Sequence, residues 1–156
     1  MDRRSVRVFL VDGHDVVRRG LRWLLERDAG IEVVGEASGA AEALRLLPGS
    51  SPQVVVVDAR LPDGDGAEVC RRVREADPSV GVLVLTSCED DATLFAAIEA
   101  GAAGFLLKRL RGNDIANAVR TIAAGDSLLD ERVVGTVLER LRSGPPGRFR
   151  AGRRDS

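Results

Sequence analysis

Short apolar runs alternate five times with segments of helical periodicity, and this alternation restricts the fold more than any other feature of the chain. The predicted strands are rich in β-branched residues and cover Val6 to Val11, Ile31 to Glu36, Val54 to Asp58, Val80 to Thr86 and Gly104 to Leu107. The predicted helices cover Val16 to Arg27, Ala40 to Leu47, Ala67 to Ala76, Ala92 to Ala100 and Asn113 to Ala124. Strands that alternate with helices in this way form a parallel sheet.

Right-handed crossovers arrange such a chain most simply as a flavodoxin-like (βα)5 doubly wound α/β sheet with the strand order 2-1-3-4-5. The first and third strands are then neighbours at the switch point, where ligands bind beyond the strand ends. Asp12 follows the first strand and Asp58 ends the third, so we expect their carboxylates to face each other. Asp58 is either a nucleophile or metal ligand at the strand tip, or a residue that only caps the following turn.

Two more polar groups are predicted at the same edge of the sheet. Thr86 ends the fourth strand and Lys108 follows the fifth. Lys108 is the one lysine among 23 lysine and arginine residues, and a compact ammonium is not interchangeable with a planar guanidinium beside a small anion. A surface lysine placed there by chance is the alternative interpretation. Two carboxylates, a hydroxyl and an ammonium around one crevice suit an aspartyl phosphate.

These residues resemble the response-regulator receiver domains of two-component signalling, over about residues 6 to 142. The resemblance is closest to the NarL/LuxR-type transcriptional regulators, particularly the dormancy-survival regulator branch. It rests on the stretches Val-Phe-Leu-Val-Asp-Gly-His-Asp-Val-Val-Arg-Arg-Gly, Asp-Ala-Arg-Leu-Pro-Asp-Gly-Asp-Gly, Leu-Thr-Ser and Gly-Phe-Leu-Leu-Lys. The resemblance implies a phosphoprotein, not an enzyme, that receives a phosphoryl group from a sensor histidine kinase in a phosphorelay and belongs to transcription regulation. The sequence shows neither a signal peptide nor an apolar stretch of membrane-spanning length, so we expect a cytoplasmic protein.

The same resemblance assigns roles to individual residues. Asp58 is the phosphoacceptor, and Mg²⁺ is held by Asp12, Asp58 and the backbone carbonyl of Arg60. Thr86 and Lys108 are the signalling pair. A haloacid-dehalogenase-like phosphatase, the enzyme alternative, expects an Asp two residues after the nucleophile, and Arg60 at that position argues against it.

One departure from the family pattern affects the metal. Receivers usually carry two adjacent acids after the first strand, and the second contacts Mg²⁺, but here that position is Gly13. A water could take its place, because Mg²⁺ keeps several waters. Losing a negative ligand should nevertheless weaken Mg²⁺ binding and slow phosphorylation. The chain is therefore either a working receiver or a phosphorylation-independent pseudo-receiver that acts by dimerisation.

The neighbouring His14, the only histidine, is open to more than one interpretation. It is either a loop residue, as in similar regulators, or a metal ligand or phosphoryl carrier. Cys70 and Cys88 form no metal-ligand spacing with it, so we expect both cysteines to be free thiols in a reducing compartment and expect no zinc site.

Signalling surfaces are predicted in two places. Phe105 is, by the resemblance, the aromatic residue whose rotamer follows Thr86, although an ordinary buried strand residue is the alternative. The family transmits its switch through the face of the fourth helix, fifth strand and fifth helix. The apolar residues of these two helices either belong to this face or are ordinary core residues. They are Leu94, Ile98, Ile115 and Val119.

The chain is predicted to divide into a receiver domain at residues 1–125, an amphipathic linker helix at 126–142 and a disordered, arginine-rich tail at 143–156. The linker has an apolar stripe formed by Val134, Val137, Leu138 and Leu141. We expect homodimerisation through this helix or through the switch face. In the resembled family the linker leads to a helix-turn-helix domain, and the residues after the linker leave no room for a recognition helix, so no direct DNA binding is expected. No apolar stretch approaches membrane-spanning length, so no membrane association is expected either.

Overall fold

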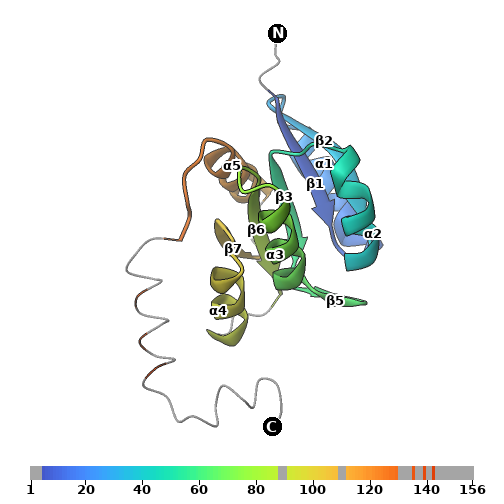
Figure 1. The fold of residues 1–156 in the computed structure, drawn as a ribbon. Helices are drawn as coiled ribbons and strands as arrows, with labels where there is room; N and C mark the ends of the chain where they lie inside the picture. The colour runs from blue at the N-terminus through green and yellow to red at the C-terminus, as the bar shows by residue number, and fades with distance from the viewer. Residues whose placement is uncertain are drawn as a thin grey trace.

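A computed structural model of the chain describes residues 5–87, 91–108 and 112–129, and also residues 135, 139 and 142. Five parallel strands form one sheet in the order β2-β1-β3-β6-β7 (Figure 1). The strands are β1 (Val6–Val11), β2 (Ile31–Ala37), β3 (Val54–Asp58), β6 (Gly81–Thr86) and β7 (Gly104–Leu107). Counted along the chain within this sheet, the order is 2-1-3-4-5, which confirms the predicted doubly wound topology.

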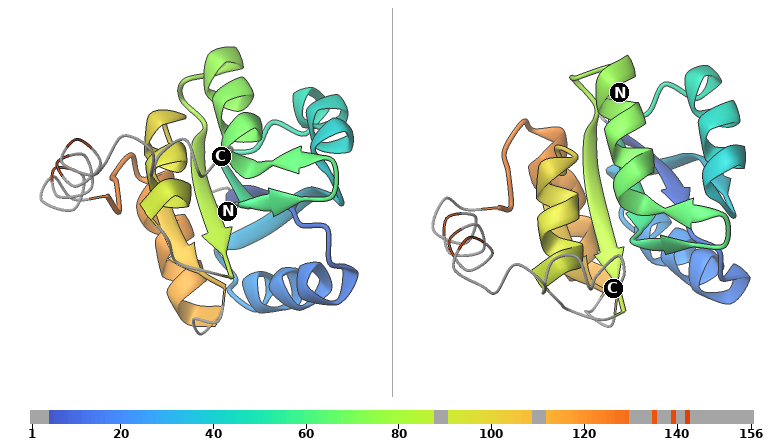
Figure 2. Two further views of the ribbon diagram at one scale, coloured as in Figure 1. Left: turned by 90° about the horizontal axis from the view of Figure 1, so that it is seen from below. Right: turned by 60° about the horizontal axis from the view of Figure 1, so that its bottom comes forward.

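Helices cover both faces of the sheet. They are α1 (Asp15–Glu26), α2 (Ala40–Leu46), α3 (Gly66–Ala76), α4 (Asp91–Glu99) and α5 (Gly112–Ala123), and the 3₁₀ turn η1 (Leu47–Gly49) follows α2. Helices α1 and α5 lie on one face, and α2, α3 and α4 lie on the other (Figures 1 and 2). The predicted helix and strand ends agree with the structure to within one residue.

The side chains of the central strands alternate between two apolar cores. All five residues of β3 are buried, as predicted for a strand covered on both faces. Val8, Leu10, Val54 and Val56 belong to the core under α1 and α5. Phe9, Val11, Val55 and Val57 belong to the core under α2, α3 and α4. The period of two therefore also fixes the face on which each residue after a strand end lies.

The segment after β3 forms a small antiparallel ladder where the sequence predicted only a turn. Its strands are β4 (Arg60–Leu61) and β5 (Gly64–Asp65). Asp63, between them, reaches across to the N-terminus of α2. Its two carboxylate oxygens accept the backbone N–H groups of Ala40 at 2.7 Å and Ala41 at 3.1 Å. These bonds hold the loop beyond Asp58 against a neighbouring helix.

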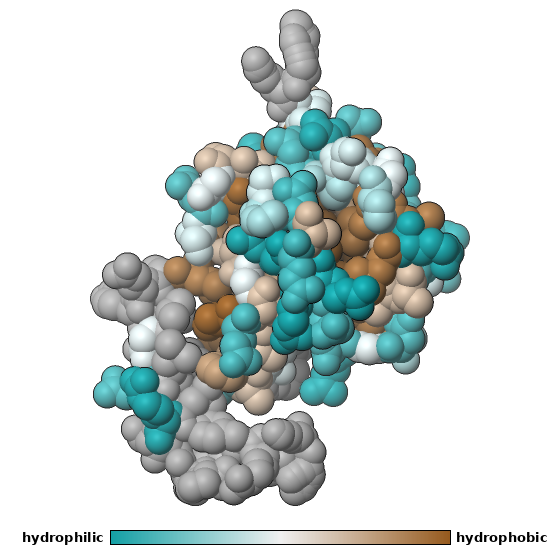
Figure 3. Space-filling view, in the orientation of Figure 1, coloured by the Kyte–Doolittle hydropathy of each residue, from teal (hydrophilic) through white to brown (hydrophobic). Residues whose placement is uncertain are grey.

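The face that carries α3 is polar along the helix, and apolar atoms gather beside it, toward α2 (Figure 3). A groove in this region is lined by Leu44, Leu47 and Val73. Arg7 and Gln53 also line it, so the groove opens at the N-terminal ends of the strands. It therefore lies at the edge of the sheet opposite Asp58.

Several predictions concern the switch face and the C-terminal segment. Ile115 and Val119 are buried core residues, whereas Leu94 and Ile98 are half-buried on α4. Residues 126–129 follow α5 without helix, and residues 135, 139 and 142 are helical. The other residues of the predicted linker helix and the tail at 143–156 lie outside the described residues. Within the part of the chain that the structure describes, no helix has the length and apolarity needed to cross a membrane.

Candidate functional site

The two acidic side chains predicted to meet do lie together at the C-terminal edge of the sheet. Strands β1 and β3 pair directly, with Val11 opposite Val57, so Asp12 and Asp58 occupy the next position on each strand. Both continue the series of side chains that faces α1 and α5. Asp12 is 1% exposed and Asp58 is 5% exposed. Two largely desolvated carboxylates side by side require positive charge nearby.

Lys108 supplies that charge from the end of β7. Its Nζ donates a hydrogen bond to Asp58 Oδ2 at 2.9 Å and lies 3.0 Å from Asp12 Oδ2. The backbone N–H of Lys108 donates to the carbonyl of Thr86 at 2.8 Å, which fixes the start of the side chain beside β6. Burial acts to lower the pKa of Lys108, but its hydrogen bonds and ion pairs with the two carboxylates outweigh burial and raise it.

The two oxygens of Asp58 have different partners. Oδ1 accepts the backbone N–H of Arg60 at 3.3 Å, as expected of a residue that caps a turn. Oδ2 is held by Lys108. The Asp58 carboxylate therefore caps the turn and faces the polar crevice at the same time. Helix α3 begins at Gly66, close to the backbone of Asp58: a Cβ on Gly66 would lie 2.3 Å from the Asp58 carbonyl oxygen, so this close approach requires glycine.

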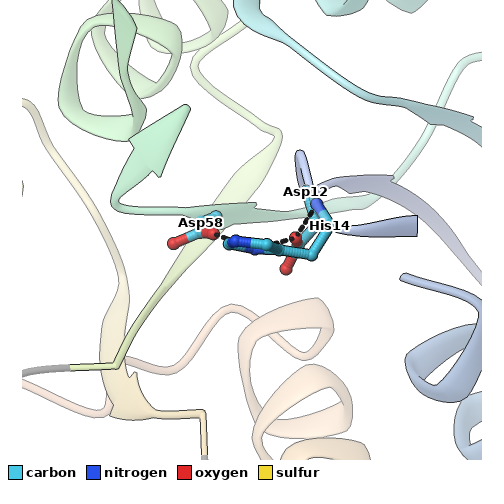
Figure 4. A group of neighbouring side chains, drawn as sticks. All are labelled: Asp12, His14 and Asp58. Atoms are coloured by element: carbon cyan, nitrogen blue, oxygen red, sulfur yellow. Dashed lines mark hydrogen bonds and ion pairs between the residues drawn. The ribbon is translucent and has the colours of Figure 1, made fainter. Parts of the chain in front are cut away.

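His14 lies between the two carboxylates (Figure 4). Asp12 Oδ1 accepts the backbone N–H of His14 at 2.8 Å, and this bond turns the loop back on itself. The ring Nδ1 then lies 3.3 Å from Asp12 Oδ1 and 3.9 Å from Asp58 Oδ2. The His14 side chain is 70% exposed, so the ring is open to solvent while both carboxylates are buried.

These donors fit a divalent cation. One ligand atom from each of Asp12, His14 and Asp58 lies within 4.8 Å of the others. Asp12 Oδ2 is buried and forms an ion pair with Lys108 Nζ at 3.0 Å, but it accepts no well-aligned hydrogen bond. Two carboxylates supplemented by waters suit Mg²⁺. The Arg60 carbonyl stays a predicted ligand, since Arg60 contacts Asp58 through its N–H and not through its carbonyl.

Pro62 and Ser38 occupy the space that a side chain at position 13 would need. A Cβ built on Gly13 would lie 2.7 Å from Cδ and 2.8 Å from Cγ of Pro62, and 3.3 Å from the carbonyl oxygen of Ser38. Carbon atoms in good contact lie about 3.5–4.0 Å apart. Restoring an acid at position 13 therefore requires the loop of Gly13 or the loop of Pro62 to move.

Arg18 also positions the end of β1, and sequence reasoning did not single it out. Its Nη1 donates to the carbonyl oxygen of Asp12 at 2.6 Å, and its Nε donates to Glu36 Oε1 at 2.8 Å. Nothing in the sequence distinguishes Arg18 from the other arginines of the chain. The contacts of Arg18 with Asp12 and Glu36 form only because α1 packs against β1 and β2.

Thr86 and Phe105 lie on the other face of the sheet. Thr86 is buried one residue beyond Leu85, which is the register partner of Asp58. Phe105 packs partly buried against the core under α2, α3 and α4, opposite Val84. The structure thus places Thr86 and Phe105 on the same side of adjacent strands, whereas their roles in signalling stay predictions.

Comparisons with known proteins agree with this arrangement. Residues 8–120 match the family described as the response regulator receiver domain. The chain is 47% identical over 137 residues to the DNA-binding transcriptional activator DevR/DosR of Mycobacterium tuberculosis, covering 88% of this chain and 63% of that protein. It is 42% identical over 139 residues to the transcriptional regulatory protein LiaR of Bacillus subtilis, covering 88% and 65%. The chain thus spans less than two thirds of these relatives.

A solved structure supports the same similarity. The signal receiver domain of the response regulator NarL from Mycobacterium tuberculosis superposes with a TM-score of 0.74 at 37% identity, covering 78% of this chain and 98% of that one. The chain is therefore similar both in sequence and in fold to receivers of transcriptional regulators.

Proposed function

Since the chain belongs to the response regulator receiver family, we propose that it accepts a phosphoryl group on Asp58 from a sensor histidine kinase and signals by a change in its association. The observation that carries this proposal is the hydrogen bond from Lys108 Nζ to Asp58 Oδ2 at 2.9 Å. An ammonium at this distance from the acceptor oxygen is also within reach of an oxygen of an incoming phosphoryl group.

The reaction follows from the partners of Asp58. A carboxylate oxygen forms a bond to phosphorus while the P–N bond of the donor phosphohistidine breaks, and the electron pair of that bond stays on the imidazole nitrogen. Lys108 is placed to transfer its contact from the carboxylate to a phosphoryl oxygen, and the Thr86 hydroxyl is proposed to donate to another. A divalent cation held by Asp12 and Asp58 would supply further positive charge against the loose transition state.

Phosphorylation changes the charge of the crevice more than Lys108 alone can balance. A phosphoryl group carries about −1.5 to −2 charges at neutral pH, but on Asp58 it replaces the single negative charge of the carboxylate, so the crevice becomes more negative by about 0.5 to 1 charge. Thr86 and Phe105 lie on adjacent strands beneath α4, so a movement of Thr86 toward the phosphoryl group would be transmitted to the half-buried residues Leu94 and Ile98. We propose homodimerisation through this face or through the linker helix as the output, in a cytoplasmic regulator of transcription.

Intact-mass spectrometry after incubation with acetyl phosphate and Mg²⁺ tests the phosphoacceptor. The wild-type chain is expected to gain the mass of one phosphoryl group, and Asp58→Asn none. Asp65→Asn is the matched control, because Asp65 lies in the same loop but only caps α3 by accepting the Glu68 N–H at 2.9 Å. Labelling of Asp58→Asn to the wild-type extent would contradict the assignment.

A second candidate, the phosphorylation-independent dimerisation module, is favoured by two observations. Gly13 contributes no side-chain metal ligand, and Lys108 Nζ lies within 3.0 Å of both carboxylates, so its charge offsets part of theirs. For this function, Asp58→Asn and the wild type should form the same dimer in sedimentation experiments, with or without phosphodonor. A dimer that forms only in the phosphorylated wild type would exclude it.

A further inference from the structure

We propose that His14 is a nitrogen ligand of the cation site and that this pocket therefore prefers a first-row transition-metal cation, such as Co²⁺ or Zn²⁺, to Mg²⁺. This inference rests on the proposed function, since it concerns the cation that assists Asp58. It departs from the magnesium site that the family resemblance predicts, because the third protein donor here is an imidazole and not a carboxylate.

The positions of the donor atoms carry the inference. His14 Nδ1 faces Asp12 Oδ1 at 3.3 Å and Asp58 Oδ2 at 3.9 Å, so one ring nitrogen points at both carboxylates (Figure 4). Asp12 Oδ2, in a side chain only 2% exposed, has Lys108 Nζ at 3.0 Å as an ion-pair partner but accepts no well-aligned hydrogen bond. A buried carboxylate oxygen can take more than one polar partner, and a bound cation would supply a second one beside Lys108.

Hydrogen bonds of the loop place the backbone of His14 beside the two carboxylates. The His14 N–H donates to Asp12 Oδ1 at 2.8 Å, and Arg18 Nη1 donates to the Asp12 carbonyl oxygen at 2.6 Å. Gly13 allows the loop to lie against Pro62, at a position where any Cβ would be too close. Gly13, which stands in place of the usual acid, therefore also allows the close approach to Pro62 of the loop that carries His14.

The chemistry of the donors favours transition metals. A family receiver with two acids after its first strand would have three carboxylates here, whereas Asp12 and Asp58 provide two, and Lys108 offsets one of their charges. Mg²⁺ binds hard oxygen ligands and gains mainly from negative charge, so this pocket attracts it less. An imidazole nitrogen suits Zn²⁺, Co²⁺ and related ions, whose affinities for such sites rise along the Irving–Williams series.

Calorimetric titration of the unphosphorylated full chain with Co²⁺ and with Mg²⁺ tests this preference. We expect Co²⁺ to bind more tightly than Mg²⁺, and His14→Ala to weaken Co²⁺ binding at least about tenfold, since even indirect partners of a metal change affinity by about 10–100-fold. Mg²⁺ binding should change much less. Asp15→Ala is the matched control for the adjacent charge, and Cys88→Ser is the control for a thiolate ligand; both should retain the Co²⁺ preference.

A second measurement uses the fact that the chain has one histidine. Diamagnetic Zn²⁺ should shift the imidazole ¹⁵N resonances of the wild type, and Asp12→Asn should abolish that shift. Unshifted resonances at saturating Zn²⁺, a Co²⁺ preference retained in His14→Ala, or one lost in Cys88→Ser would each overturn the inference. These readouts do not involve phosphorylation. Asp58 labelling that fails with every cation would instead remove the proposed function.

Discussion

The contact between Gly13 and Pro62 yields a prediction whose magnitude follows from the structure. Replacing Gly13 with Ala places a Cβ 2.7 Å from Pro62 Cδ, well inside the about 3.5–4.0 Å of a good carbon–carbon contact. Gly13 does not have a left-handed φ, so backbone strain plays no part. The predicted effect is therefore purely steric.

Two opposing contributions set the size of the effect. Overpacking costs about 1–3 kcal/mol. Replacing glycine with alanine lowers the entropy of the unfolded chain and recovers about 0.4–1 kcal/mol. We therefore expect Gly13→Ala to lower the free energy of unfolding by about 1–2 kcal/mol, which for 156 residues corresponds to a Tm lower by about 2–8 °C.

Urea unfolding of four proteins isolates this contact: the wild type, Gly13→Ala, Pro62→Ala and the double variant. Removing the proline ring should relieve the overlap, so the cycle should give a favourable coupling of about 1–2 kcal/mol, within the range found for residues in contact. Gly20→Ala is the matched control, because its Cβ would meet nothing within 4 Å and should stabilise α1 by about 0.5–1 kcal/mol.

The steric explanation makes two demands on these data. Gly13→Ala must be less stable than the wild type, and its loss must shrink in the Pro62→Ala background. If Gly13→Ala is as stable as Gly20→Ala, or if the coupling is below about 0.5 kcal/mol, the loop has room for a side chain and the reasoning fails. The usual acid at position 13 would then be restorable by a single substitution.

Three further predictions concern charge and burial. Lys108→Met leaves two buried carboxylates without their cation and should cost about 1–3 kcal/mol of unfolding free energy at neutral pH, part of which Co²⁺ should restore in urea titrations. Burial raises the pKa of Cys70 to about 11, so in Cys88→Ser a thiol reagent should react only after unfolding, and rapid labelling of the folded protein would contradict this. Burial acts to raise the pKa of Glu36, but hydrogen bonds from Arg18 and Arg22 outweigh it and hold the pKa below its ordinary 4.5. The stability that these bonds provide is present above pH 4.5 and is lost as the pH falls through the lowered pKa. In urea unfolding, the difference in stability between the wild type and Glu36→Gln should therefore shrink in acid.

The fold was predictable from the sequence because each helix and strand can be recognised from the residues within it. Apolar runs such as Val54 to Val57 and helical stripes define each element from its own residues, and the alternation of elements then determines the sheet. The convergence of Asp12, Asp58 and Lys108 follows from the same logic, because parallel strands end at one edge. Residues after strand ends could therefore be assigned to the site before any contact was known.

The parts that escaped prediction are contacts between loops. Asp63 caps α2 from the far side of the β4–β5 turn, although in the sequence it belongs only to a turn. Gly13 was recognisable as a missing acid, but Pro62, the reason that a side chain does not fit, is distant in sequence. The bond from the His14 N–H to Asp12 is a common turn pattern, but that the His14 ring then lies beside Asp58 depends on how β1 and β3 pair, and His14 and Asp58 are distant in sequence.

The loop contacts of Gly13 and His14 determine which groups can hold a cation beside Asp58. If the acid at position 13 had simply been lost, its space would remain, but Pro62 fills it. A phosphoryl group on Asp58 carries about −1.5 to −2 charges but replaces the single negative charge of the carboxylate, so the pocket would become more negative by about 0.5 to 1 charge. Lys108 Nζ, 2.9 Å from Asp58 Oδ2, supplies one positive charge, and a bound divalent cation would offset the added negative charge. Among the residues that the structure describes, His14 is the third donor within reach of both carboxylates, so the identity of that cation depends on the histidine.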